Sequence, residues 1–222
     1  MIYAMNVWTL LVWSVFLSVP EPATVLQIPQ DPDPAYTQVI LERAGKIVDM
    51  LGLDDSALAQ QVCNLIADQY RSLSILQDTR DSRIKAVQSQ VGDNGSPDSI
   101  KLAIQALKEM TQALQEQLHI RYLLKLSALL TPAQIDQIKD GMTYGLVQAT
   151  YNAYLEMLPQ LTEPQKAAIM AYLLEAREMA MDAGSSKEKH QWFGKYKGRI
   201  NNYLSSQGYD LKEASKERNA RN

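Results

Sequence analysis

The sequence is poor in the side chains that form covalent and metal cross-links. It has a single cysteine, Cys63, and two histidines in 222 residues. One cysteine allows no internal disulfide, and zinc sites are built mainly from cysteine and histidine. A chain of this length can bury a core large enough to fold without such staples. It also lacks a phosphate-binding glycine loop, so we predict no metal and no cofactor.

Positive charge is not in excess either. The formal net charge is −3 at pH 7, and the first basic residue of the chain is Arg43. Nucleic-acid-binding domains usually carry a strongly basic surface. The charge balance therefore predicts no nucleic-acid partner.

The N-terminus has one apolar run, and it is short. Residues 7–19 are almost wholly apolar, but a helix that spans a bilayer needs about 20 such residues. A short run followed by a small residue, here Ala23, is typical of a signal peptide, although the expected positive charge before the run is missing. We expect residues 1–23 to be a signal peptide and the protein to be periplasmic or secreted. A membrane-tethered N-terminus is the alternative.

Strand signals are also missing, because no run alternates convincingly between apolar and polar residues. Prolines mark residues 24–35 as a linker, and apolar residues then recur at helical spacing. The predicted fold class is all-α: a helical bundle of five to seven helices in a single domain over residues 36–210, with a charged tail over 211–222. The spacing predicts helices over residues 36–51, 54–91, 99–129, 132–157, 163–183 and 185–206, with Gly141 or Gly145 as the place where the fourth could break.

The second and third of these helices are long. A polar loop over residues 92–98 separates them, so we expect a long antiparallel helical hairpin whose distal half projects into solvent. Its surface could bind a protein partner or a second copy of the chain. The two following helices each begin with Leu-Thr and a glutamine three residues after the threonine, at Leu130 and Leu161. This pattern is typical of a capping box.

Trp192 and Phe193 stand out near the C-terminus. Two other tryptophans and one phenylalanine lie in the predicted signal peptide, so these two residues are the last Trp and Phe of the remaining chain. On a helix, Phe193 shares a stripe with Ile200 and Leu204, which predicts a core position. Gly194 and Gly198 are four residues apart, a spacing that we expect to let another helix approach closely.

Trp192 falls on an adjacent helical face with aromatic and basic neighbours. A flat indole can stack on a sugar ring, and cationic and amide groups can donate hydrogen bonds to its hydroxyls. The candidate ligand-binding residues are Trp192, Tyr196, Arg199, Tyr203, His190, Lys195, Asn202 and Arg177. The alternative is that Trp192 and the tyrosines pack at the edge of a helical core.

Three carboxylates form the one group that suggests catalysis. Glu175, Glu178 and Asp182 share a face of the helix over residues 163–183, and two carboxylates can act as acid and base in glycoside cleavage. A solvated acidic face paired with Arg177 and nearby lysines explains the same spacing. We therefore assign no catalytic residue, and a non-enzymatic protein is the preferred interpretation.

Several segments resemble a known family. They are residues 140–145, 175–186 and 192–203, with weaker similarity at 43–48 and 69–73. Together they resemble domain-of-unknown-function family 3826, a family of exported bacterial proteins described as sugar-binding. The resemblance implies export, a helical fold and a connection to carbohydrate, and it carries over no catalytic residue. The Leu-Thr-x-x-Gln repeats also resemble those of small helical periplasmic chaperones, over two five-residue boxes.

The sequence thus favours an exported helical protein that binds carbohydrate and acts in a polysaccharide-handling system. A periplasmic chaperone-like or scaffold protein is the alternative, and a glycan-active enzyme is the third choice.

Overall fold

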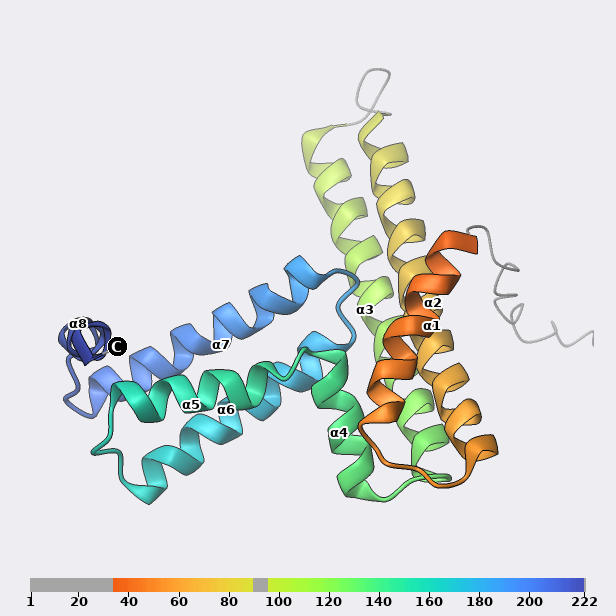
Figure 1. Ribbon diagram of the computed structural model, residues 1–222. Helices are drawn as coiled ribbons and strands as arrows, with labels where there is room; N and C mark the ends of the chain where they lie inside the picture. The colour runs from red at the N-terminus through yellow and green to blue at the C-terminus, as the bar shows by residue number, and fades with distance from the viewer. Residues whose placement is uncertain (1–33, 90–95, 222) are drawn as a thin grey trace, which may run out of the picture.

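The computed structural model describes residues 34–89 and 96–221, which form eight α-helices and no strands (Figure 1). The all-α fold class is therefore confirmed, with eight helices in these residues where five to seven were expected. The predicted signal peptide and most of the predicted linker lie outside the described residues. The helices are α1 Pro34–Asp49, α2 Ser56–Ser89, α3 Pro97–Ser127, α4 Pro132–Met142, α5 Leu146–Met157, α6 Glu163–Met181, α7 Ser186–Ser206 and α8 Leu211–Arg221.

Two features account for the higher helix count. The chain breaks between α4 and α5, at the second of the two glycines expected to do so. Tyr144 and Gly145 both adopt left-handed backbone, with φ of 59° and 64°, a conformation that is uncommon for a residue as large as tyrosine. Helix α8 occupies the region predicted as a charged tail, where the Asp210 carboxylate accepts the first backbone N–H groups and so caps the helix.

Helices α2 and α3 form the predicted antiparallel hairpin (Figure 1). Each begins at a capping residue: the Asp55 carboxylate accepts the N–H of Ala57 at 2.8 Å, and the Ser96 hydroxyl accepts the N–H of Ser99 at 3.2 Å. The distal ends of both helices extend beyond the rest of the molecule. The proximal half packs against α1 and encloses a first hydrophobic cluster of buried residues that includes Ile40, Ile66 and Leu126.

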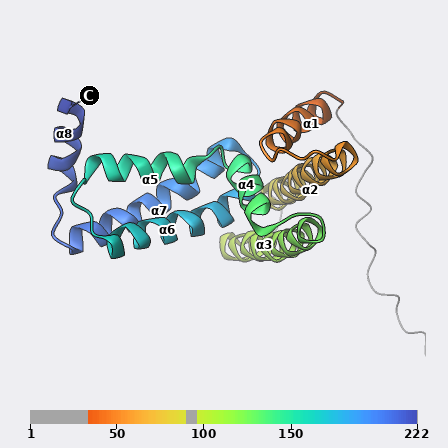
Figure 2. The ribbon, with the colours of Figure 1, turned by 60° about the horizontal axis from the view of Figure 1, so that its bottom comes forward.

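Helices α5, α6 and α7 form a second group, which extends sideways from the hairpin with α8 at its far end (Figure 2). This group encloses a second hydrophobic cluster. Phe193, Ile200 and Leu204 lie in it and are at most 2% exposed, so the predicted core stripe of α7 is confirmed. Helix α7 is thereby fixed with Phe193 inward, which turns the neighbouring Trp192 toward a different side.

The short helix α4 lies between the first group of helices, α1, α2 and α3, and the second group, α5, α6 and α7. It packs against α1, α3 and α6 (Figure 2). It packs tightly on α1 at Gly141, where an added Cβ would lie 2.8 Å from Cγ1 of Ile47. The expectation of a close helix approach at Gly194 and Gly198 is wrong, because a Cβ at either position would meet no atom within 4 Å. Helical spacing of glycines therefore did not identify the tight contact.

Candidate functional site

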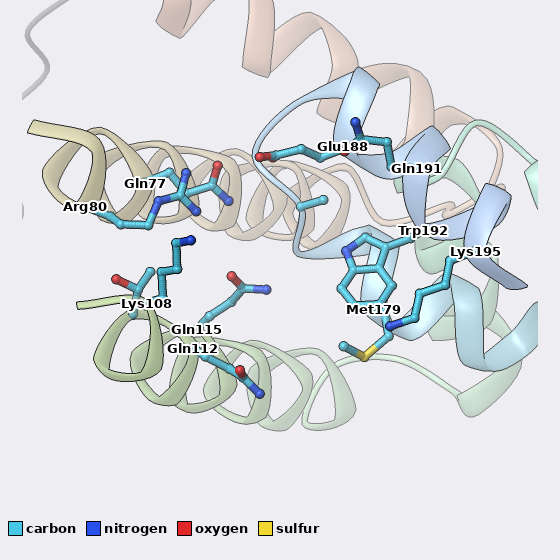
Figure 3. A pocket seen from close by; sticks show the side chains of 12 residues that line it. Gln77, Arg80, Lys108, Gln112, Gln115, Met179, Glu188, Gln191, Trp192 and Lys195 are labelled. Carbon is cyan, nitrogen blue, oxygen red and sulfur yellow. The ribbon is translucent and has the colours of Figure 1, made fainter. Parts of the chain in front are cut away.

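A pocket of about 450 Å³ lies between the hairpin and the α6–α7 pair (Figure 3). Helices α2 and α3 supply the residues of one wall, and α6 and α7 supply those of the other. The volume falls in the range of sites that bind small molecules. Because the walls come from the two helical groups, the pocket depends on how these groups are held together.

Trp192 is the aromatic residue of the pocket. Its indole is half-buried and packs at the edge of the second hydrophobic cluster. Figure 3 shows it beside Met179 of α6, on the side of the pocket that faces the hairpin. The Lys195 ammonium, one helical turn further along α7, lies 4.8 Å from the centre of the Trp192 ring, which is a cation–π distance.

The wall opposite Trp192 is rich in amide side chains. Gln77 comes from α2, while Gln112 and Gln115 come from successive turns of α3, and Gln191 adds a fourth amide from α7 (Figure 3). Each amide carries both donors and an acceptor. The pocket therefore combines one flat aromatic side chain with several groups that can both donate and accept hydrogen bonds.

Two of the eight candidate ligand-binding residues, Trp192 and Lys195, line this pocket. Tyr196 is 7% exposed and belongs to the second hydrophobic cluster. The Arg199 guanidinium lies 4.7 Å from the centre of the Tyr196 ring, and Tyr203 is half-buried with its ring 6.3 Å from that of Tyr172. Tyr196 and Tyr203 thus occupy the core-edge position that the alternative interpretation gave the tyrosines, while Arg199 is exposed.

Two further candidates are exposed elsewhere on α7. His190 places Nδ1 2.8 Å from the carbonyl oxygen of Ser186, and its ring stacks on Tyr144 with the ring centres 6.0 Å apart. Asn202 is also exposed. Neither residue is among those that line the pocket between the two helical groups.

Arg177, the last candidate, joins α6 to α4. It is 5% exposed, and its terminal nitrogens lie 2.9 Å from Asp140, 2.7 Å from Asp136 and 3.3 Å from Glu178. Burial acts against the guanidinium charge, but the hydrogen bonds to Asp140 and Asp136 outweigh it and raise the pKa of Arg177. The structure thus gives Arg177 a role in holding two helices together.

The three carboxylates expected to share a face have different surroundings. Glu175 is exposed and lies 3.5 Å from Arg199. Glu178 is partly exposed and lies 2.8 Å from the Lys139 ammonium. Asp182 is only 5% exposed, so the solvated acidic face expected from the spacing does not extend to it.

Asp182 connects α6 to both helices of the hairpin. Its carboxylate accepts a hydrogen bond from Gln69 Nε2 of α2 at 3.3 Å and lies 2.6 Å from Nδ1 of His119 on α3. The hydrogen bond to Asp182 raises the pKa of His119, while burial opposes the shift. A signal for this contact was present in the sequence: Gln69 occupies a position of the apolar stripe that includes Ile66 and Leu73, where a buried polar group requires a partner.

Lys189 caps the C-terminus of α6 beside the Asp182 contact. Its ammonium donates to the carbonyl oxygens of Ala180 and Met181 at 3.1 and 2.9 Å, which are among the groups that a helix C-terminus leaves without an internal partner. Burial lowers the pKa of Lys189 to about 8. The turn into α7 is thus fixed from within, next to Asp182.

The Asp182 contact lies next to the pocket, both on α3 and at the turn between α6 and α7. His119 lies one helical turn beyond Gln115 on α3, and Ala183, which lines the pocket, directly follows Asp182. At the next residue, Gly184, an added Cβ would overlap the side-chain amide of Gln77. A larger residue at this position would therefore displace the Gln77 side chain, which lines the pocket.

Within residues 34–89 and 96–221, no three or more His, Cys, Asp or Glu side chains are grouped so that they could hold a metal ion. No helix in the same residues is long and apolar enough to cross a membrane.

The His119–Asp182 contact predicts a pH dependence of stability. Because the pKa of His119 is raised above its ordinary value of about 6.5, its charged form stabilises the fold fully below that pH. This stabilisation is lost as the pH rises through the raised value. The free energy of unfolding of the wild type should therefore exceed that of His119→Gln by more at about pH 5.5 than at about pH 8.5.

Urea unfolding of both proteins at the two pH values measures this difference. The titration of Lys189, with its pKa of about 8, is common to both proteins and cancels in the comparison. An equal difference at the two pH values would contradict the assigned contact.

Comparison with known proteins places this architecture in a family. No curated protein matches the chain. The family described as "Protein of unknown function (DUF3826)" matches residues 37–222, a range that includes every helix from the first turn of α1 to α8. The resemblance predicted from the sequence segments is thereby confirmed, and the chain belongs to the DUF3826 family of proteins of unknown function.

Proposed function

We propose that the protein is an exported carbohydrate-binding protein and that it binds a sugar in the pocket between the hairpin and α7. The observation that carries this proposal is the position of Trp192. Its half-buried indole forms part of one wall, and three glutamine side chains are part of the wall across from it. No acid–base pair faces the pocket among the residues that line it, so the proposed role is binding.

The chemistry of a sugar fits this pairing of walls. One face of a pyranose ring carries mainly C–H groups and packs well against an aromatic ring, which buries apolar surface. Its hydroxyls each donate and accept, as the amides of Gln77, Gln112 and Gln115 also do. A few well-placed polar groups around an apolar surface are what small-ligand sites use for orientation.

The proposal predicts that Trp192→Ala abolishes binding with a modest loss of stability. Phe193→Ala, its neighbour in the core, should cost about 3–5 kcal/mol, whereas Trp192 is half-buried and should cost clearly less. In a protein that begins at Thr24, Trp192 is the one tryptophan, so its fluorescence should change on titration with oligosaccharides that bind.

A matched control is Tyr144→Ala, which removes an aromatic side chain that is 48% exposed on another surface. This variant should bind as the wild type does. Two results would count against the proposal: no change of Trp192 fluorescence across a panel of neutral and acidic oligosaccharides, or equal affinities for the wild type and Trp192→Ala.

A second candidate, a scaffold that pairs with a copy of itself, rests on the outer face of α3. Four large apolar residues are exposed there: Leu102, Met110, Ile120 and Leu124, at 73%, 44%, 59% and 65%. Helical geometry places them on one broad face of α3, and an exposed apolar seam of this kind often marks an interaction surface.

The scaffold candidate predicts association that depends on this seam. The double substitution Ile120→Gln with Leu124→Gln should convert a dimer to a monomer in light scattering without changing stability. Leu174→Gln, at an apolar position on α6 that is 37% exposed, is the control and should leave the dimer intact. A wild type that is monomeric at high protein concentration would remove this candidate.

A further inference from the structure

The pocket has more positive than negative charge. Arg80 of α2, Lys108 of α3 and Lys195 of α7 line it, together with one carboxylate, that of Glu188, among the described residues. The whole chain has the opposite balance, with a net charge of −3. A cleft lined by charges of one sign concentrates ligands of the opposite sign.

The Glu188 carboxylate serves the turn that begins α7. Its Oε2 accepts the backbone N–H of Gly184 at 3.1 Å, and its own N–H donates to the Ser185 hydroxyl at 3.1 Å. This reciprocal arrangement resembles a capping box. Glu188 therefore has a local structural role and does not pair with the cations of the pocket at the distances of an ion pair.

Arg80 and Lys108 lie opposite each other on the two antiparallel helices of the hairpin. Figure 3 shows the ends of their side chains directed toward one another at the same end of the pocket. Arg80 uses Nε to bind Asp81 at 2.8 Å, so the two terminal nitrogens are the ones it can offer to a ligand. Two cations that face each other repel, and an anion bound between them converts the repulsion into two charge-assisted hydrogen bonds.

We propose that the ligand of this pocket is an acidic glycan, in which Trp192 holds a sugar ring and Arg80 and Lys108 bind an acidic group of the same or an adjacent residue. The acidic group is a carboxylate, as in a uronic acid, or a sulfate ester. A planar guanidinium matches the paired oxygens of such groups, and an ammonium adds a second charge. This inference rests on the proposed carbohydrate-binding function and assigns the class of carbohydrate.

Calorimetric titration of the full chain with matched pairs of oligosaccharides tests the inference. One pair is an oligogalacturonate and its methyl ester, and the other is a sulfated galactan oligosaccharide and its desulfated form. The acidic member of at least one pair should bind on the order of tenfold more tightly than its neutral partner. The pair that shows the preference identifies the acidic group, and the preference should shrink in high salt.

Two double variants test whether Arg80 and Lys108 are the cations that bind the acidic group. The double variant Arg80→Gln with Lys108→Gln should bind acidic and neutral members with equal affinity. The control is Arg83→Gln with Lys101→Gln, on the same two helices at exposed positions that do not line the pocket. This control should keep the full preference.

The outcomes separate this inference from the function on which it rests. If the wild type binds acidic and neutral members equally, and Trp192→Ala abolishes both, the acidic preference is wrong and carbohydrate binding stands. If the control variant loses the preference as the pocket variant does, the assignment to Arg80 and Lys108 is wrong. If no oligosaccharide binds, both proposals fall.

Discussion

The arrangement of the two helical groups depends on the hydrogen bonds of the Asp182 carboxylate. Asp182 stands at the end of α6, is 7% exposed at its side chain, and binds Gln69 of α2 and His119 of α3 together. A carboxylate buried to this degree is costly unless its hydrogen bonds are satisfied. The hairpin satisfies them from both of its helices, so loss of Gln69 or His119 with the packing intact would leave a buried carboxylate oxygen without its partner.

The position of the pocket follows from this contact. Lys189 binds the last carbonyl groups of α6 and fixes the turn, and the stripe that contains Phe193 anchors α7 on the second hydrophobic cluster. Helix α7 begins beside the hairpin and extends away from it (Figure 2), and Trp192, near its start, lies on the pocket side (Figure 3). The pocket lies between the start of α7 and the hairpin, next to the point where Asp182 joins α6 to the hairpin. Its polar lining residues lie on the outward faces of helices whose inward faces pack in the core.

Much of the fold could be predicted from the sequence because helices are local. The capping box at Thr131, where its backbone N–H donates to Gln134 Oε1 at 3.0 Å, was readable from two residues three positions apart. The separation of Phe193 from Trp192 followed from helical geometry and is confirmed for Phe193. In contrast, His119 and Asp182 are 63 residues apart, and no periodicity indicates which polar residues of different helices will meet.

The same limit explains which site residues could be placed. Helical spacing showed that Tyr196 shares a face with Trp192, but that face divides between the core and the pocket, and Tyr196 is buried in the cluster. Arg177 belongs to a basic and acidic segment typical of a solvated surface, yet it is buried against α4. The amides of Gln77, Gln112 and Gln115 belong to the hairpin, far from Trp192 in sequence, and only the tertiary fold brings them to the pocket.

The most direct test of the pocket as a binding site is the NMR spectrum of the side-chain N–H groups during titration with an acidic oligosaccharide. Our account predicts that the indole resonance of Trp192 and the amide resonances of Gln77, Gln112 and Gln115 shift together along one saturation curve, because they form opposite walls of one site. Shifts confined to one wall, or centred on His190 and Tyr144, would contradict it.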